Sequence, residues 1–169
     1  MNTTSPLDFQ WMSLLGFSTI LFLLFGLMNV LVGVLTPFFV RPDRLTQNAL
    51  LMSERTDTVL FGGPPSELLT QNKSLGLLRR LLVYWLAGLL LSFGLFQLAL
   101  TWFGLRQGQA WALWTLTAAD LAMLPYWYMI LNTYAHAGVA PGIGEMPPFL
   151  PYLGVIPIAA VLGWIGLRA

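Results

Sequence analysis

The chain of 169 residues contains no cysteine, few charged residues (9%) and a single histidine. The absence of cysteine excludes disulfide bonds, thiolate zinc or iron–sulfur sites and a cysteine nucleophile, and it leaves the redox compartment undetermined. The net charge of +1 provides no general attraction to nucleic acid. Because soluble domains average about 25% charged residues, the low charge is typical of a membrane protein and not of a soluble one.

Most residues of the chain are apolar. They make up 57% of the chain, and the mean hydropathy is +0.72. A spanning helix needs about 20 mainly apolar residues, and four segments meet this requirement, at about residues 11–40, 77–103, 110–134 and 149–167. We therefore predict an all-α polytopic membrane protein, a single domain of four transmembrane helices in a compact bundle.

The first and last spans each have an alternative interpretation. The N-terminal sequence MNTTSPLDFQW lacks the basic region and small-residue cleavage site of a signal peptide, so residues 11–40 are predicted to remain as a span. Pro151 and Pro157 interrupt the fourth span. Membrane helices tolerate proline where neighbouring helices satisfy the freed carbonyls, and a re-entrant or broken hairpin is the alternative for this segment.

The distribution of basic residues predicts the orientation. Six of the eight Lys and Arg residues lie between the first span and the start of the second, whereas only Arg106 and Arg168 lie on the opposite side. This asymmetry places residues 41–76 in the cytoplasm and both termini outside, in a plasma membrane of bacterial type. Trp11, Trp102, Trp111, Trp114 and Trp164 then fall near the outer interface, and Tyr84, Tyr128, Tyr134 and Tyr152 near the inner one, as expected for aromatic belts.

The cytoplasmic segment 41–76 is predicted to have structure of its own. In PDRLTQNALLMSER, apolar residues at Leu45, Ala49 and Met52 have helical spacing, and Pro42–Asp43 form a plausible helix start. We expect a short amphipathic helix on the inner membrane surface. The sequence FGGPP at 61–65 predicts a turn, and Ser66 is a candidate cap for the helix that follows.

Asp120 is the strongest candidate for a functional residue. It lies within the third span, nine residues after Trp111, which is about 14 Å at 1.5 Å per residue and near the middle of the hydrocarbon core. An ionisable residue at that depth is costly and is a functional candidate by default. No basic residue lies within thirteen positions, so we expect a protonated carboxyl that donates a hydrogen bond.

The polar side chains expected near Asp120 leave three interpretations open. They are Asn29 on the first span, Ser92 and Gln97 on the second and Thr117 on the third, with Trp127 as an aromatic wall. Asp120 could join helices together, anchor a ligand between them, or transfer protons. Pro125 is expected to kink the third span and to free the carbonyl of Leu121.

Few other residues offer chemistry. His136 follows the third span, and it lacks the further ligands at suitable spacing that a metal site needs, so no metal site is predicted. As a single imidazole it could be an axial ligand to a haem or pigment, or simply an interfacial histidine. The small-residue pairs Gly88–Ser92 and Ala159–Gly163 permit close helix approach.

The loop FGLRQGQAWALW, residues 103–114, resembles a segment of small four-helix membrane proteins of the DoxX-like type. The resemblance covers about a dozen residues together with the four-span topology. It implies a compact four-helix bundle, in some cases associated with membrane oxidoreductase assemblies. The long first loop and the lack of cysteine depart from that pattern and put a redox role of this chain in doubt.

Three hypotheses for function follow. The first is a non-catalytic accessory or structural subunit of a larger membrane complex, with the bilayer and other membrane subunits as partners and no cofactor. The second is a binding protein, or an isomerase, for an apolar ligand such as a lipid, a sterol-like molecule or a quinone, held near Asp120 and Trp127. The third is a proton-coupled transporter, which would require Asp120 to reach water.

Overall fold

The computed structural model describes residues 10–39, 49–147 and 149–169, and this part of the chain consists of helices joined by turns and loops, with no strand. The all-α prediction is therefore confirmed for these residues. The α-helices are α1 (Leu14–Phe39), α2 (Glu54–Phe61), α3 (Pro65–Gln71), α4 (Lys73–Phe103), α5 (Ala110–Leu121), α6 (Leu124–His136), α7 (Phe149–Tyr152) and α8 (Ile156–Gly166). Short 3-10 helices occupy Leu105–Gln107, Ile143–Glu145 and Leu153–Val155.

In the part of the chain that the structure describes, two helices, α1 and α4, are long and apolar enough to cross a membrane, by length and composition. They correspond to the first two predicted spans, although α4 starts at Lys73, where Asn72 Oδ1 accepts the amide of Leu75 and caps the helix. The other two predicted spans are not single long helices. The helix over 110–134 is broken at Ala122–Met123, and the segment 149–167 consists of α7, a 3-10 turn and α8.

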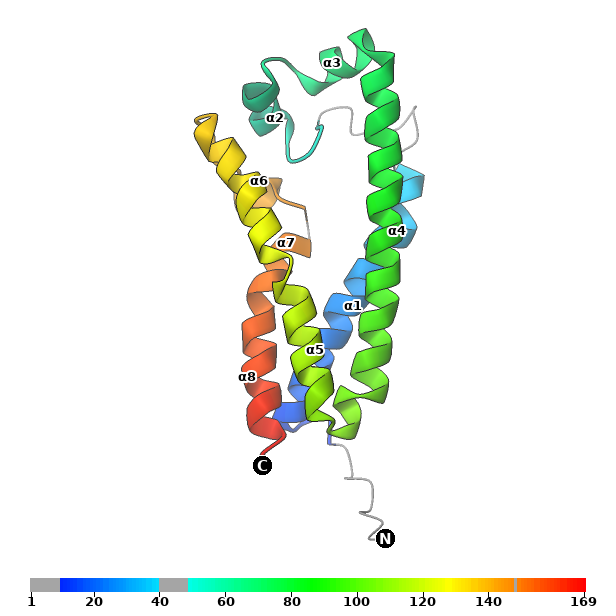
Figure 1. Ribbon diagram of the computed structural model, residues 1–169, viewed down its shortest axis with the longest axis vertical. Coiled ribbons are helices and arrows are strands. Elements are labelled where there is room, and N and C mark those ends of the chain that lie inside the picture. The colour runs from blue at the N-terminus through cyan, green and yellow to red at the C-terminus, as the bar shows by residue number, and fades with distance from the viewer. Residues whose placement is uncertain (1–9, 40–48, 148) are drawn as a thin grey trace.

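Proline explains where both of these segments change direction. Pro125 lies in the first turn of α6 and Pro157 in the first turn of α8, positions at which a helix does not need the missing amide. The expected kink near Pro125 is thus a two-residue break before α6. In Figure 1, α6 leans away from α4 after this break, so that the helices diverge towards the end of the molecule that carries α2 and α3.

Glycines bring α1 and α4 into close contact. A Cβ atom added to Gly94 would lie 2.7 Å from the carbonyl oxygen of Gly26, and one added to Gly33 would lie 2.7 Å from the amide nitrogen of Leu91. The backbones approach as closely as small-residue membrane interfaces allow. Helix α8 packs on α1 in the same way, since a Cβ at Gly163 would meet Ser18 Oγ at 2.6 Å.

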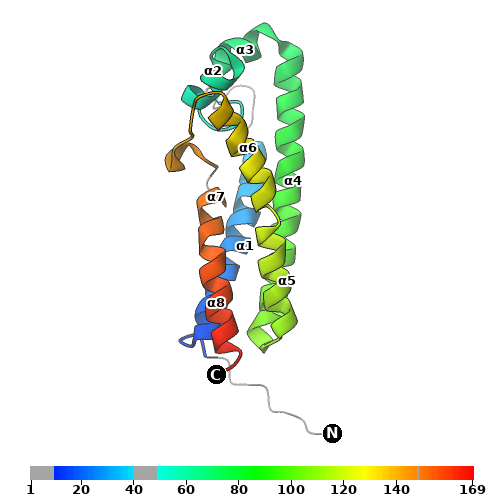
Figure 2. The same cartoon turned by 60° about the vertical axis from the view of Figure 1, so that its left-hand side comes forward.

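The main apolar core lies between α1, α5, the 3-10 turn before α8, and α8 itself. Its buried members include Phe22, Leu113, Leu116 and Ile156. Figures 1 and 2 both place the start of α1 and the end of α8 at one end of the molecule, opposite α2 and α3. The path of the described chain therefore runs along the long axis four times, through α1, α4, α5–α6 and α8.

We call residues 49–72 the head segment. The predicted amphipathic helix is only partly testable, because Pro42, Asp43 and Leu45 lie outside the described residues. Its described part is wrong: residues 49–53 are irregular, and α2 begins at Glu54 because Ser53 Oγ accepts the amide of Thr56 as an N-cap.

The predicted FGGPP turn is confirmed. Gly62 ends α2 with a φ of 75°, a conformation that favours glycine. Pro65 then starts α3, with Pro64 as the residue before the helix. The prediction that Ser66 caps this helix is wrong, because the helix begins one residue earlier, at Pro65.

Candidate functional site

Three buried polar side chains connect α1, α4 and α5 across the bundle. Asn29 Nδ2 donates to Gln97 Oε1 at 3.5 Å, and Gln97 Nε2 donates to Asp120 Oδ2 at 3.1 Å. Asp120 is fully buried, and the other two side chains are 2% exposed. We call these residues the polar tie. The amide of Gln97 bonds both partners because its oxygen faces Asn29 and its nitrogen faces Asp120.

In the hydrogen bond that joins Gln97 to Asp120, Gln97 donates and Asp120 Oδ2 accepts. That the carboxyl of Asp120 is protonated and donates a hydrogen bond stays a prediction. The oxygen of Gln97 is already engaged by Asn29, so its nitrogen is the atom that turns to Asp120. Asp120 Oδ1 has no hydrogen-bond partner.

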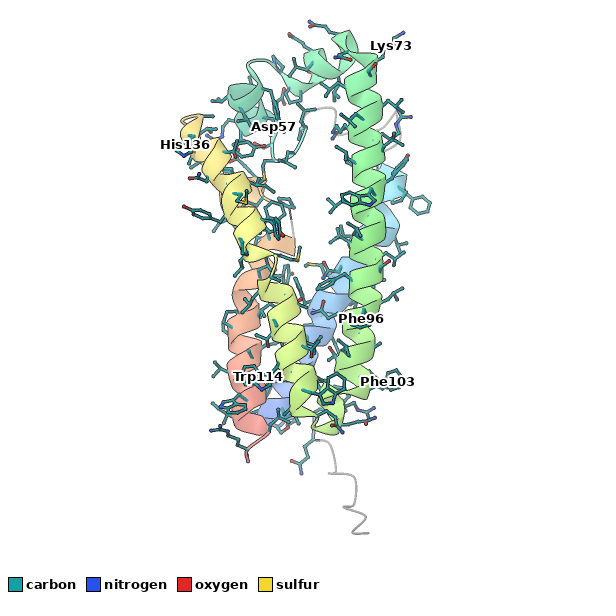
Figure 3. All side chains as sticks on the ribbon, in the orientation of Figure 1. Asp57, Lys73, Phe96, Phe103, Trp114 and His136 are labelled. Carbon is teal, nitrogen blue, oxygen red and sulfur yellow. The ribbon has the colours of Figure 1, made fainter. Side chains whose placement is uncertain are left out.

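The space beside Asp120 is small. Its cavity is about 30 Å³ and is lined by Phe93, Phe96, Gln97 and Leu116 among others. Figure 3 shows Phe96 on α4, on the side of that helix where α5 lies. A water molecule occupies about 30 Å³, whereas pockets for drug-sized ligands measure about 300–1,000 Å³. The geometry therefore favours the interpretation in which Asp120 joins helices over one in which it anchors a lipid or quinone.

The other residues predicted near Asp120 do not join the polar tie. Ser92 is exposed, because five residues of helix turn it about 140° away from Gln97. Thr117 is buried but donates to the carbonyl of Leu113 in its own helix at 2.8 Å. Trp127 does not line the cavity beside Asp120; the break at Ala122–Met123 changes the helical register between them, and Trp127 packs between the two apolar clusters.

His136 is the last residue of α6 and is exposed (Figure 3). A histidine in the last turn is favourably placed at the negative end of the helix dipole. Within the described residues, no group of three or more His, Asp or Glu side chains is arranged to hold a metal ion. Its role as an axial ligand remains a prediction.

A second buried polar group fastens the head segment to α6. Asp57 is fully buried, and its carboxylate accepts the amides of Leu50 and Leu51 at 2.5 and 2.8 Å. It also accepts the amide of Met52 at 3.3 Å and the hydroxyl of Tyr134 at 2.6 Å. Figure 3 shows Asp57 in the upper part of the molecule, near the end of α6. One carboxylate thus orders an irregular turn and bonds it to a helix 77 residues away.

Glu145 makes a second connection to the head segment, at the surface of the molecule. It forms an ion pair with Arg55 Nη2 at 2.6 Å and accepts hydrogen bonds from Ser53 Oγ at 2.9 Å and the amide of Gly142 at 2.7 Å. The hydrogen bond from Arg55, then those from Gly142 and Ser53, lower the pKa of Glu145 to about 2. The carboxylate is therefore charged at neutral pH and links the loop before α7 to the head segment.

The sequence offered only part of this second site. Serine is a favoured N-cap residue, so Ser53 could have located the start of α2. No local pattern connects Asp57 with Tyr134, because residues 77 positions apart meet only through the tertiary fold. Tyr134 was expected at an interface and is instead fully buried.

We predict that Asp120→Asn preserves the fold whereas Asp120→Ala destabilises it. The asparagine oxygen can still accept from Gln97, so the loss should be below about 1 kcal/mol. Alanine leaves the buried Gln97 amide without its acceptor, at a cost of about 1–3 kcal/mol. Thermal unfolding in detergent, followed by circular dichroism, measures both. Equal and large losses in the two variants would contradict this prediction, because asparagine keeps an acceptor for Gln97 and alanine does not.

Comparisons with known proteins do not identify a family for this chain. No family model, no curated protein and no solved structure matches this chain significantly.

Proposed function

We propose that this chain is a non-catalytic, four-span integral membrane protein that acts as an accessory subunit of a larger membrane complex. The spans would be α1, α4, α5 with α6, and the segment from α7 to α8. The four passes along the long axis support this topology, and the start of α1 and the end of α8 lie at the same end of the molecule (Figures 1 and 2).

Aromatic and basic side chains at that end support a membrane interface there. Arg106 lies 4.3 Å from the ring centre of Trp102, and Arg168 lies 3.7 Å from that of Trp164. Trp164 also packs against Trp114, with ring centres 5.1 Å apart. Tryptophan is enriched at headgroup depth, and arginine keeps its charged head group in water while its stem covers apolar surface. In our proposal this end faces the outside and the head segment lies in the cytoplasm.

The exposed surface of α4 is the main support for the proposed accessory role. Only 22% of the most apolar stretch of α4 is buried. Gly88 and Ser92 lie exposed on that surface, and a Cβ atom added to Gly88 would meet nothing within 4 Å. Lipid can cover the larger apolar side chains, but an exposed small-xxx-small pair lets another helix approach the backbone closely. The association with oxidoreductase assemblies implied by the DoxX-like resemblance is one form of this proposal.

The test is native mass analysis after mild detergent extraction from the native membrane. The wild-type chain should appear with a second, different membrane protein, and Gly88→Leu should release that protein because leucine prevents close helix approach. Gly154→Leu is the matched control, since Gly154 is also exposed with nothing within 4 Å of an added Cβ. A wild-type chain that is always monomeric and without partners would refute the proposal.

A further inference from the structure

A larger cavity lies far from the polar tie, between the head segment and the first half of α4. Its volume is about 410 Å³, and its walls are Leu50, Phe61 and Leu68 of the head segment together with one face of α4 from Leu75 to Leu86. This volume is within the range of about 300–1,000 Å³ typical of ligand pockets. The accessory role does not use this cavity.

The apolar part of the cavity wall spans about two thirds of one leaflet of a bilayer. Arg79 and Leu86 are seven residues apart on α4, about 10 Å along the helix axis. Half of a hydrocarbon core of about 30 Å is about 15 Å. Leu78, Leu82 and Leu86 are each about half exposed, at 53%, 53% and 44%. If α4 crosses the membrane as proposed, this face is open to the acyl chains of one leaflet.

The charged residue of the cavity wall is Arg79. It lies at the head-segment end, and its Nε donates to the carbonyl of Leu50 at 3.4 Å, which holds the guanidinium against the wall. Beyond it, the wall formed by Leu82, Val83 and Leu86 is entirely apolar. A guanidinium binds phosphate by charge and by its planar set of N–H donors. Along α4, away from the head segment, the cavity wall therefore presents first a cation and then an apolar groove.

We propose that this cavity binds one acyl chain of an anionic phospholipid, with the lipid phosphate at Arg79 and the chain along Leu82 and Leu86. The site is on the side of the membrane that carries the head segment. This inference rests on the membrane embedding proposed above and not on the accessory role. The polar tie at Asp120 takes no part in it.

The test compares lipid retention by four variants in native mass analysis. Purified protein in detergent is mixed with equal amounts of dioleoyl phosphatidylglycerol and dioleoyl phosphatidylcholine. Arg79→Gln removes the charge from the cavity wall, and Arg80→Gln is its control, because Arg80 does not line the cavity. Leu82→Trp fills the groove, and Leu81→Trp is its control, since Leu81 is 56% exposed but does not line the cavity.

The wild-type chain should retain one phosphatidylglycerol in preference to phosphatidylcholine by about tenfold, the equivalent of one hydrogen bond to a charged group. Arg79→Gln should lose this preference and Leu82→Trp should lose both lipids, while both controls behave as wild type. If Leu82→Trp fails to fold, Leu82→Phe should show a partial loss of both lipids.

Three results would overturn the lipid site. They are equal retention of the two lipids by the wild type, equal effects of Leu81→Trp and Leu82→Trp, and a density map that places residues 40–48 in the cavity. Resistance of the chain to extraction from membranes by alkaline carbonate tests the membrane embedding separately. A chain that resists extraction but shows no lipid preference would reject the site and leave the proposed topology in place.

Discussion

Replacing Asp57 with alanine is expected to release the head segment from α6 and to destabilise the protein by about 3 kcal/mol or more. The variant removes the acceptor of the Leu50, Leu51 and Met52 amides and of the Tyr134 hydroxyl. Each buried donor left without a partner costs about 1–3 kcal/mol, and opening of the turn to water would recover part of that cost. The released part should be the head segment, because the core between α1, α5 and α8 does not involve Asp57.

Hydrogen exchange followed by mass spectrometry measures this effect locally. Peptides that contain residues 50–52 should lose protection by about 100-fold, which corresponds to about 3 kcal/mol, while peptides from α1 should keep theirs. Tyr134→Phe removes one of the donors and should have a smaller effect. Glu67→Ala, at an exposed acid on α3, is the control and should change stability by less than about 0.5 kcal/mol. Unchanged exchange at residues 50–52 in Asp57→Ala would show that the turn does not depend on this carboxylate.

Replacing Gly94 with alanine is expected to destabilise the contact between α1 and α4 by about 1–3 kcal/mol, the usual cost of overpacking. The added Cβ would lie 2.7 Å from the carbonyl oxygen of Gly26 and 2.8 Å from the amide nitrogen of Val30. Both atoms belong to the backbone, so relief requires movement of a whole helix and not of a side chain. The change runs against intrinsic propensity, because alanine is about 1 kcal/mol better than glycine within a helix.

Gly88 offers the matched control on the same helix. A Cβ atom at Gly88 meets nothing within 4 Å, so Gly88→Ala should stabilise the purified chain by about 0.5–1 kcal/mol. The opposite signs of the two substitutions in thermal unfolding would separate close packing from helix propensity. If Gly94→Ala were also stabilising, α1 and α4 would have to lie further apart than in the structure.

The sequence predicted best those features that depend on consecutive residues. The apolar run at 77–103 became α4, with its end at Phe103 as predicted, because composition and helical propensity are properties of consecutive residues. The FGGPP turn was predictable for the same reason. The break at Ala122–Met123 was only partly predictable: Pro125 indicated a kink, whereas the direction in which α6 leaves the bundle depends on its contacts with the head segment through Tyr134.

The polar residues show the limit of sequence patterns most clearly. Counting residues along the spans placed Ser92 at about the depth of Asp120 and Gln97 nearer the outer interface. The structure instead brings Gln97 together with Asn29 and Asp120. Ser92 faces outward because its position around α4 differs from that of Gln97. Depth follows from counting residues along a span, but the direction of a side chain depends on how each helix is rotated against its neighbours.

The close approach of α1 and α4 had a signal in the sequence that only the structure makes meaningful. Gly26 and Gly33 are seven residues apart on α1, and Ala87 and Gly94 are seven apart on α4, so each pair lies on one helix face. The pair Ala159–Gly163 was predicted to permit close packing, and both residues are buried. The pair Gly88–Ser92 has the same pattern and is exposed, because a small-residue pattern alone does not indicate which partner covers it.

The sequence by itself determined that the chain forms apolar helices with few charges, since these properties depend on composition and on neighbouring residues. Only the tertiary structure decided which polar groups meet. Asn29 reaches Gln97 across 68 positions and Tyr134 reaches Asp57 across 77, and no local spacing encodes such pairs. A buried polar group must find a partner somewhere in the fold, and the packing of the helices determines which one.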